Sequence, residues 1–180
     1  MELPAQNIKN LFGDMSFATK QTAINYKMTY DNTFIGEDYR YTAINFKNPD
    51  SIAQLSPILW LDLYKKDFDS IFVKFFNKNS KLELQNSSAL PVTLLVNTER
   101  LRQGIFGYMV RPTRAELDIT CTFIESESKK VLAVYSIKNI EKMGFASGKK
   151  NKNTAVFIKM AYEVAGAKFA YYLKKKTKIK

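Results

Sequence analysis

Histidine is absent from the 180 residues of this chain. Its absence excludes Ser-His and Cys-His nucleophile pairs, imidazole metal sites and the most common general base of enzymes. An enzyme with this composition would need carboxylates or lysines in a pocket that shifts their pKa values. The sequence therefore favours a protein that is not an enzyme and that needs no cofactor.

Cysteine is nearly absent as well, because Cys121 is the only one. A single cysteine excludes an internal disulfide and gives no indication of the compartment. Cys121 falls on the apolar side of a predicted strand, where a lone thiol is usually a core residue. A reactive thiolate would need a cationic and partly exposed setting instead. We therefore predict a buried, structural cysteine.

Long hydrophobic runs are also missing. No apolar segment approaches the roughly 20 residues that a membrane-spanning helix needs, and Ile58–Leu63 is interrupted by Asp62. The N-terminus has no basic segment followed by an apolar one, so no signal peptide is visible. Two locations stay open: the cytoplasm, or the periplasm and envelope if an export signal was removed before Met1.

The residues that are abundant are those of a folded core. Apolar residues make up 46% of the chain, and the 10 Tyr and 13 Phe predict a core with many aromatic rings. The length suits one domain. We expect a loosely ordered leader over residues 1–20, a single domain over residues 21–174 and a lysine-rich tail over residues 175–180.

The clearest local pattern is a pair of strand-like segments. Between Ala115 and Phe123 the odd positions are apolar and the even positions polar, which is the period of a strand with one buried face. Val131–Ile140 is a second strand-like segment, apolar at its odd positions as far as Ile137 and also at Leu132 and Val134, so we expect cover on both faces at one end. Glu125–Lys130 between the two segments has the length of a hairpin loop. The sequence therefore predicts an antiparallel hairpin, which needs an apolar cover.

Two segments have the spacing of amphipathic helices. The first runs from Trp60 to Asn77, with Pro57 in its first turn. The second follows the hairpin and has its apolar residues between Phe157 and Leu173. Lysines after Leu173 offset the helix dipole. We predict that this second helix covers the buried face of the hairpin.

Further strands are predicted at Thr22–Tyr30, around Leu82 and Leu84, and in Val92–Val96 with a continuation towards Leu101. Tyr39–Phe46 could be a strand, a loop or a short helix. Together these elements predict an α+β fold. We expect a mostly antiparallel sheet of four or five strands, with two amphipathic helices packed on one face.

Paired carboxylates are the remaining candidates for chemistry. Glu116 and Asp118 share the polar side of the first hairpin strand, where they could bind a divalent cation or share a proton. Solvated outward positions are favoured over either role, and we interpret Glu125 and Glu127 in the hairpin loop in the same way. We therefore assign no catalytic residue and no metal ligand.

A glycine-containing loop, Gly144–Gly148, precedes Lys149 and Lys150. A phosphate-binding Walker loop needs the pattern G-x-x-x-x-G-K-[ST]. Here the glycines are closer together and neither Ser nor Thr follows the lysine. We interpret the segment as a flexible connection between a strand and the last helix.

Positive charge is concentrated at the C-terminal end. Lys149–Lys180 contains 10 Lys and one acid, so it accounts for +9 of the net charge of +11. The candidate anion-binding residues are Lys149, Lys150, Lys152, Lys174, Lys175 and Lys176, with Lys159 and Lys168 between them. They could neutralise the phosphates of nucleic acid or lipid headgroups. A solvated helix face with a frayed tail is favoured over that role.

Four segments carry a resemblance to known proteins: Pro91–Gly104, Ala115–Glu125, Lys130–Ile137 and Ile158–Ala170. Their pattern resembles uncharacterised envelope lipoproteins of Bacteroidetes, which are similar in shape to the curli-secretion and penicillin-binding-protein-activator lipoprotein domains. The resemblance implies an α/β domain exported to the periplasm that acts through protein contacts. It identifies no functional residues, and this chain lacks the lipobox cysteine.

The sequence thus favours a non-enzymatic protein-interaction or scaffolding domain, associated with the envelope. This hypothesis predicts an exposed apolar patch, for which Ile105–Tyr108 is a candidate, or a sheet edge that is open to pairing. The alternative is binding of nucleic acid or an anionic membrane surface through the lysine-rich C-terminal helix. Neither hypothesis names a partner protein.

Overall fold

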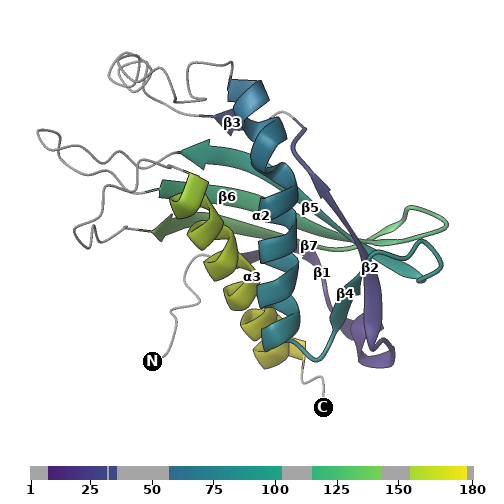
Figure 1. The fold of residues 1–180 in the computed structure, drawn as a ribbon. Helices are drawn as coiled ribbons and strands as arrows, with labels where there is room; N and C mark the ends of the chain where they lie inside the picture. The colour runs from purple at the N-terminus through teal and green to yellow at the C-terminus, as the bar shows by residue number, and fades with distance from the viewer. Residues whose placement is uncertain (1–7, 32, 36–56, 103–114, 143–154, 178–180) are drawn as a thin grey trace, which may run out of the picture.

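The computed structural model describes residues 8–31, 33–35, 57–102, 115–142 and 155–177. They form two layers, a sheet and a pair of helices that both lie on one of its faces (Figure 1). The elements in chain order are β1 (Ile8–Gly13), the 3-10 helix η2 (Ser16–Lys20), β2 (Ala23–Thr29), β3 (Phe34–Ile35), α2 (Pro57–Asn79), β4 (Glu83–Gln85), β5 (Val92–Arg102), β6 (Ala115–Glu125), β7 (Val131–Lys142) and α3 (Ala155–Thr177).

The sheet has seven strands in the order β1-β7-β6-β5-β2-β4, and the short β3 pairs with the end of β5. The neighbours β1/β7, β7/β6 and β6/β5 are antiparallel. Strand β2 lies parallel to both β5 and β4, since α2 provides the crossover that parallel strands need. The predicted α+β class, the mostly antiparallel sheet and the two helices on one face are confirmed. The predicted number of strands is too low.

The hairpin and its covering helix are also confirmed. Leu117 and Ile119 on β6 are fully buried, and their strand pairs with β7 as predicted. The Phe169 ring of α3 lies 6.1 Å from the Phe123 ring and 5.6 Å from the Tyr135 ring. Helix α3 therefore packs on the apolar face of the hairpin.

Helices α2 and α3 run in the same direction and contact each other closely (Figure 1). Gly166 of α3 makes this approach possible, because an added Cβ would lie 2.5 Å from the carbonyl oxygen of Phe72. Rings stack across the interface, with Tyr162 and Phe68 5.1 Å apart. The helix pair thus forms one continuous cover over the sheet.

Residues 8–20 differ from the predicted loose leader. Strand β1 pairs with β7, and Met15 and Ala18 around η2 are buried. The Phe17 ring lies 5.4 Å from the ring of Phe123. A bulge after Asn10 interrupts the strand, so its sequence lacks the regular alternation by which strands are recognised. The boundaries of the predicted domain and tail stay predictions.

The core is aromatic, as the composition predicts. The largest fully buried side chains include Phe68, Phe72, Phe76, Phe123, Tyr162 and Phe169. Cys121 is fully buried among them, and this burial raises the pKa of its thiol well above the usual value. The prediction of a structural cysteine is therefore confirmed.

Three sequence predictions concern segments outside the described residues: Tyr39–Phe46, the apolar loop Ile105–Tyr108 and the connection Gly144–Gly148 with Lys149 and Lys150 after it. Within the described residues, neither helix has the length and apolar character needed to span a bilayer.

Candidate functional site

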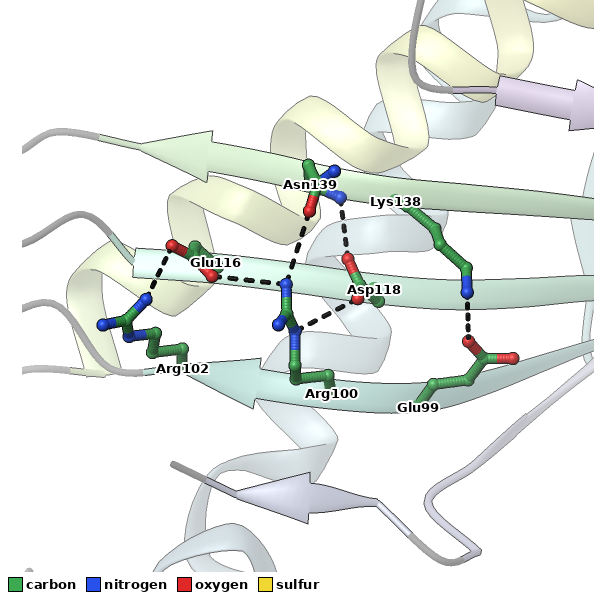
Figure 2. Close-up of polar contacts among 7 residues, drawn as sticks. All are labelled: Glu99, Arg100, Arg102, Glu116, Asp118, Lys138 and Asn139. Carbon is green, nitrogen blue, oxygen red and sulfur yellow. Dashed lines mark hydrogen bonds and ion pairs between the residues drawn. The ribbon is translucent and has the colours of Figure 1, made fainter. Parts of the chain in front are cut away.

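A cluster of charged and amide side chains lies on the sheet face opposite the helices, and we call it the ion-pair cluster (Figure 2). Its members are Glu99, Arg100 and Arg102 on β5, Glu116 and Asp118 on β6, and Lys138 and Asn139 on β7. Three cations and three anions balance one another. The cluster is therefore neutral as a whole.

Arg100 lies at its centre. Its Nη2 is 3.3 Å from Oε2 of Glu116, and its Nε is 3.1 Å from Oδ2 of Asp118. Nη2 also donates a hydrogen bond to Oδ1 of Asn139. Arg102 approaches the other carboxylate oxygen of Glu116 at 3.0 Å. Since the Arg100 and Asp118 side chains are only 25% and 12% exposed, these pairs are poorly screened by water.

Irregular strand pairing brings the cluster together. The β5/β6 register shifts at Glu99, and the β6/β7 register shifts so that Lys138 and Asn139 together face Asp118. Asn139 adopts a positive φ of 53°, which asparagine tolerates better than most residues. Its backbone N–H donates to Oδ1 of Asp118 at 2.7 Å. The bulges thus direct side chains from three strands towards one point.

Glu99 forms the outer part of the cluster. It accepts a hydrogen bond from the Thr120 hydroxyl and lies 3.8 Å from Nζ of Lys138. The Lys138 side chain is 59% exposed, so this pair contributes little stability. The inner pairs around Arg100 and Arg102 are shorter and less exposed than this one.

The arrangement does not suit acid–base or metal chemistry. The Glu116 and Asp118 carboxylates are already neutralised by guanidinium groups. Within the described ranges, no group of three or more His, Cys, Asp or Glu side chains could hold a metal ion. The predicted solvated position is wrong for Asp118, which is buried, because its carboxylate is held by Arg100 and Asn139. The cluster connects β5, β6 and β7 through their side chains and presents a polar surface.

A second polar group lies on the helix side of the sheet. The Tyr30 hydroxyl, just after β2, donates to Oδ1 of Asp69 on α2 at 2.6 Å. The hydroxyls of Thr98 on β5 and Tyr162 on α3 are also 2.6 Å apart. Burial raises the pKa of both tyrosines above the usual value, so both hydroxyls stay protonated. Each pair ties a helix to the sheet.

The carboxyl of Asp69 has a raised pKa. Burial is the main cause, and the hydrogen bond from Tyr30 and the charge of Lys65 offset it in part. By contrast, Glu125 at the end of β6 and Glu127 in the hairpin loop are exposed, as predicted. Asp69 is therefore a carboxylate whose charged form the fold disfavours.

The structure describes three of the six lysines that the sequence suggests for anion binding. Lys174, Lys175 and Lys176 are exposed at the C-terminal end of α3, and Nζ of Lys175 lies 4.8 Å from the Tyr171 ring. Lys159 instead pairs with Asp67 of α2 at 2.6 Å. Lys149, Lys150 and Lys152 lie outside the described residues. Anion binding by this set stays a prediction.

Exposed apolar side chains gather on the edge strand β1. Leu11 and Phe12 are neighbours there and are 60% and 56% exposed. The Asn10 side chain accepts a hydrogen bond from the Phe12 N–H and donates one to the Gly13 carbonyl. These bonds occupy backbone groups that an added strand would use. We call Leu11 and Phe12 the β1 patch. A binding partner would contact their side chains, because Asn10 already occupies the nearby backbone groups.

The sequence carries a signal for part of the ion-pair cluster. Arg100 and Arg102 alternate on one strand, as Glu116 and Asp118 do on the next. Opposite charges with the same spacing on neighbouring strands favour cross-strand pairs. The register that joins them depends on the bulges, and Asn139 showed no comparable pattern.

No protein-family model matches the sequence, and no curated protein matches it. Solved structures show distant similarity. The PelC dodecamer protein from Paraburkholderia phytofirmans is 10% identical, with 87% of this chain and 96% of that chain covered and a TM-score of 0.41. A minor lipoprotein from Acinetobacter baumannii is 9% identical, with 87% and 94% covered and a TM-score of 0.37.

A DUF330 protein from Xanthomonas campestris is 11% identical, with 63% of this chain and 62% of that chain covered and a TM-score of 0.43. These solved structures, one of which is named as a minor lipoprotein, are only distantly similar to this chain, and no sequence family is shared. At these scores and identities, the similarity establishes neither a family nor a function for this chain.

Proposed function

We propose that this protein is a non-enzymatic domain that acts by binding another protein, with the β1 patch as its contact surface. The observation that carries the proposal is that Leu11 and Phe12, side by side on an edge strand, are 60% and 56% exposed. Natural proteins usually protect such edges, and exposed apolar neighbours are typical of interaction sites.

The hydrogen bonds of Asn10 indicate how a partner would bind. Because Asn10 occupies the Phe12 N–H and the Gly13 carbonyl, strand addition along this part of β1 is disfavoured. A partner that places apolar side chains against Leu11 and Phe12 fits better. Aromatic side chains such as Phe12 often contribute strongly to protein interfaces.

Several features support a role without catalysis. The chain has no histidine, and its single thiol is buried with a raised pKa. The ion-pair cluster is neutral and internally paired. An envelope location is part of the proposal and follows from the sequence resemblance, so fractionation of the native host tests it separately.

Site-specific photo-crosslinking in the native host tests the contact surface. A photoreactive phenylalanine analogue at position 12 should give one discrete adduct with a partner protein, and Leu11→Glu in the same chain should abolish it. The matched control places the analogue at Leu63 of α2, which is 56% exposed. Absence of an adduct at position 12, or identical adducts at both positions, would overturn the proposal.

A further inference from the structure

Lysines from three parts of the chain meet at one end of the molecule, and we propose that this basic end binds the surface of an anionic lipid bilayer. Its members are Lys20 at the end of η2, Lys78 in the last turn of α2, Lys81 before β4, and Lys174, Lys175 and Lys176 at the end of α3. All six are exposed. Only the last three are evident from the lysine-rich C-terminus of the sequence.

The fold places these lysines together. A small pocket of about 10 Å³ is lined by Lys81 and Leu82 from the α2–β4 turn and by Leu173 and Lys174 from α3. The two helices run in parallel, so their C-terminal ends lie side by side at the lower end of Figure 1.

Strand pairing adds Lys20 to this end. Strands β2 and β4 start together in parallel, with Ala23 opposite Glu83 and the Glu83 N–H donating to the Thr22 carbonyl at 2.9 Å. Lys20 precedes β2 and Lys81 precedes β4, so the two lysines lie at the same end of the sheet.

The basic end carries more positive charge than the two helix dipoles and the nearby acidic residues can neutralise. Lysines at a helix C-terminus offset a dipole equivalent to roughly half a charge, and here there are two such ends. The acidic residues that the strand register brings to the same region are Asp14 and Glu83. The β6–β7 hairpin carries two acids and two lysines, which cancel. A net positive surface remains.

A bilayer suits this surface better than nucleic acid. The basic end contains lysines and no arginine among its described members, so it lacks the planar donors that read bases. The nearby rings are engaged, since Tyr171 lies under Lys175 and Tyr172 packs 5.9 Å from Tyr135. Stacking of single-stranded bases is therefore disfavoured. Clustered lysines can bind an anionic bilayer surface through charge alone, without contacts to individual bases.

Vesicle co-sedimentation tests the proposal with the full chain. We expect binding to vesicles of phosphatidylcholine containing about one third phosphatidylglycerol, and little binding to phosphatidylcholine alone. The variant Lys78→Gln, Lys81→Gln, Lys174→Gln should bind the anionic vesicles at least about 10-fold more weakly. The control variant Lys9→Gln, Lys27→Gln, Lys66→Gln removes the same charge from exposed positions elsewhere and should lose much less.

Three results would overturn the proposal. One is equal weakening by the two variants, which would mean that only the total charge matters. Another is absence of binding to anionic vesicles at low salt. The third is tighter binding to DNA or RNA than to anionic vesicles, which would assign the basic end to nucleic acid. A thermal melt of each variant confirms that it is folded before binding is compared.

Discussion

At the scale of single residues, the ion-pair cluster is the feature that most distinguishes this sheet. Arg100 holds two carboxylates and an asparagine from two other strands, and it is only 25% exposed. A guanidinium group in this position can satisfy several acceptors at fixed angles, which a lysine could not do. Arg100 therefore links three strands at one end of the sheet.

A double-mutant cycle of Arg100→Met and Asp118→Asn should reveal strong coupling. We expect urea unfolding to give a coupling free energy of about 1–3 kcal/mol between the two positions. Each single substitution leaves the charge of the remaining partner poorly solvated and without its ion pair. The control cycle is Lys65→Met with Asp62→Asn, an ion pair on α2 whose side chains are 44% and 52% exposed. That pair should show less than about 0.5 kcal/mol. Equal coupling in the two cycles would show that Arg100 has no special role.

Asp69 predicts a pH dependence of stability. Burial raises the folded-state pKa of its carboxyl above the unfolded-state value, so folding is favoured when this group is protonated. The contribution is fully present below the unfolded-state pKa and is lost as pH rises through the folded-state pKa.

Asp69→Asn should remove this contribution and keep the acceptor for Tyr30. Relative to the variant, the wild-type protein should therefore be most stable in acid and should lose that advantage as pH rises. Urea unfolding from about pH 3 to about pH 7 measures the difference. Glu127→Gln in the exposed hairpin is the control. A difference between wild type and Asp69→Asn that does not change with pH would contradict the assignment.

Residue-level predictions from sequence succeeded where a single pattern decides burial. Cys121 was placed correctly because alternation alone assigns it to the apolar face. Asp118 was placed incorrectly because its burial depends on Arg100, which is distant in sequence, and on a bulge that brings Asn139 to its carboxylate. Neither contact can be deduced from the strand that carries Asp118.

At the scale of elements, β1 is the longer of two described strands that the sequence did not reveal, the other being the two-residue β3. Its bulge is stabilised by Asn10, and the strand ends at Gly13 with a φ of 66°. An added Cβ at Gly13 would lie 1.9 Å from the Leu132 carbonyl oxygen, so only glycine fits beside β7. The edge strand that carries the β1 patch therefore depends on one glycine.

Gly13→Ala should release β1 from the sheet. We expect a loss of more than about 1 kcal/mol in the free energy of unfolding, because the new side chain has both a strained φ and a backbone clash. Hydrogen exchange should become faster in β1 and on the outer side of β7, with β5 and β6 unchanged. Phe12→Ala, at an exposed side chain, should change stability by less than about 0.5 kcal/mol. Unchanged exchange in β1 of the Gly13 variant would contradict this account.

At the scale of the whole molecule, local patterns were sufficient for the two-layer architecture. The helical spacing in α2 and α3 and the alternation in β6 and β7 each predict an apolar face, and these faces can only be buried against one another. The order of the strands in the sheet was harder to predict from the sequence. The parallel placement of β2 beside β5 depends on the crossover through α2, and the two basic helix ends become neighbours only through that topology.

The central claim is that the helix pair covers one face of the sheet and that the opposite face forms part of the molecular surface. Adjacent residues on β6 test it directly, since Cys121 is fully buried on the helix side and Thr122 is partly exposed on the other. Labelling with a maleimide reagent in native buffer should leave Cys121 almost unmodified until the protein unfolds. Thr122→Cys in a Cys121→Ser background should react faster by orders of magnitude, whereas similar rates at the two positions would contradict the architecture and the surfaces proposed on it.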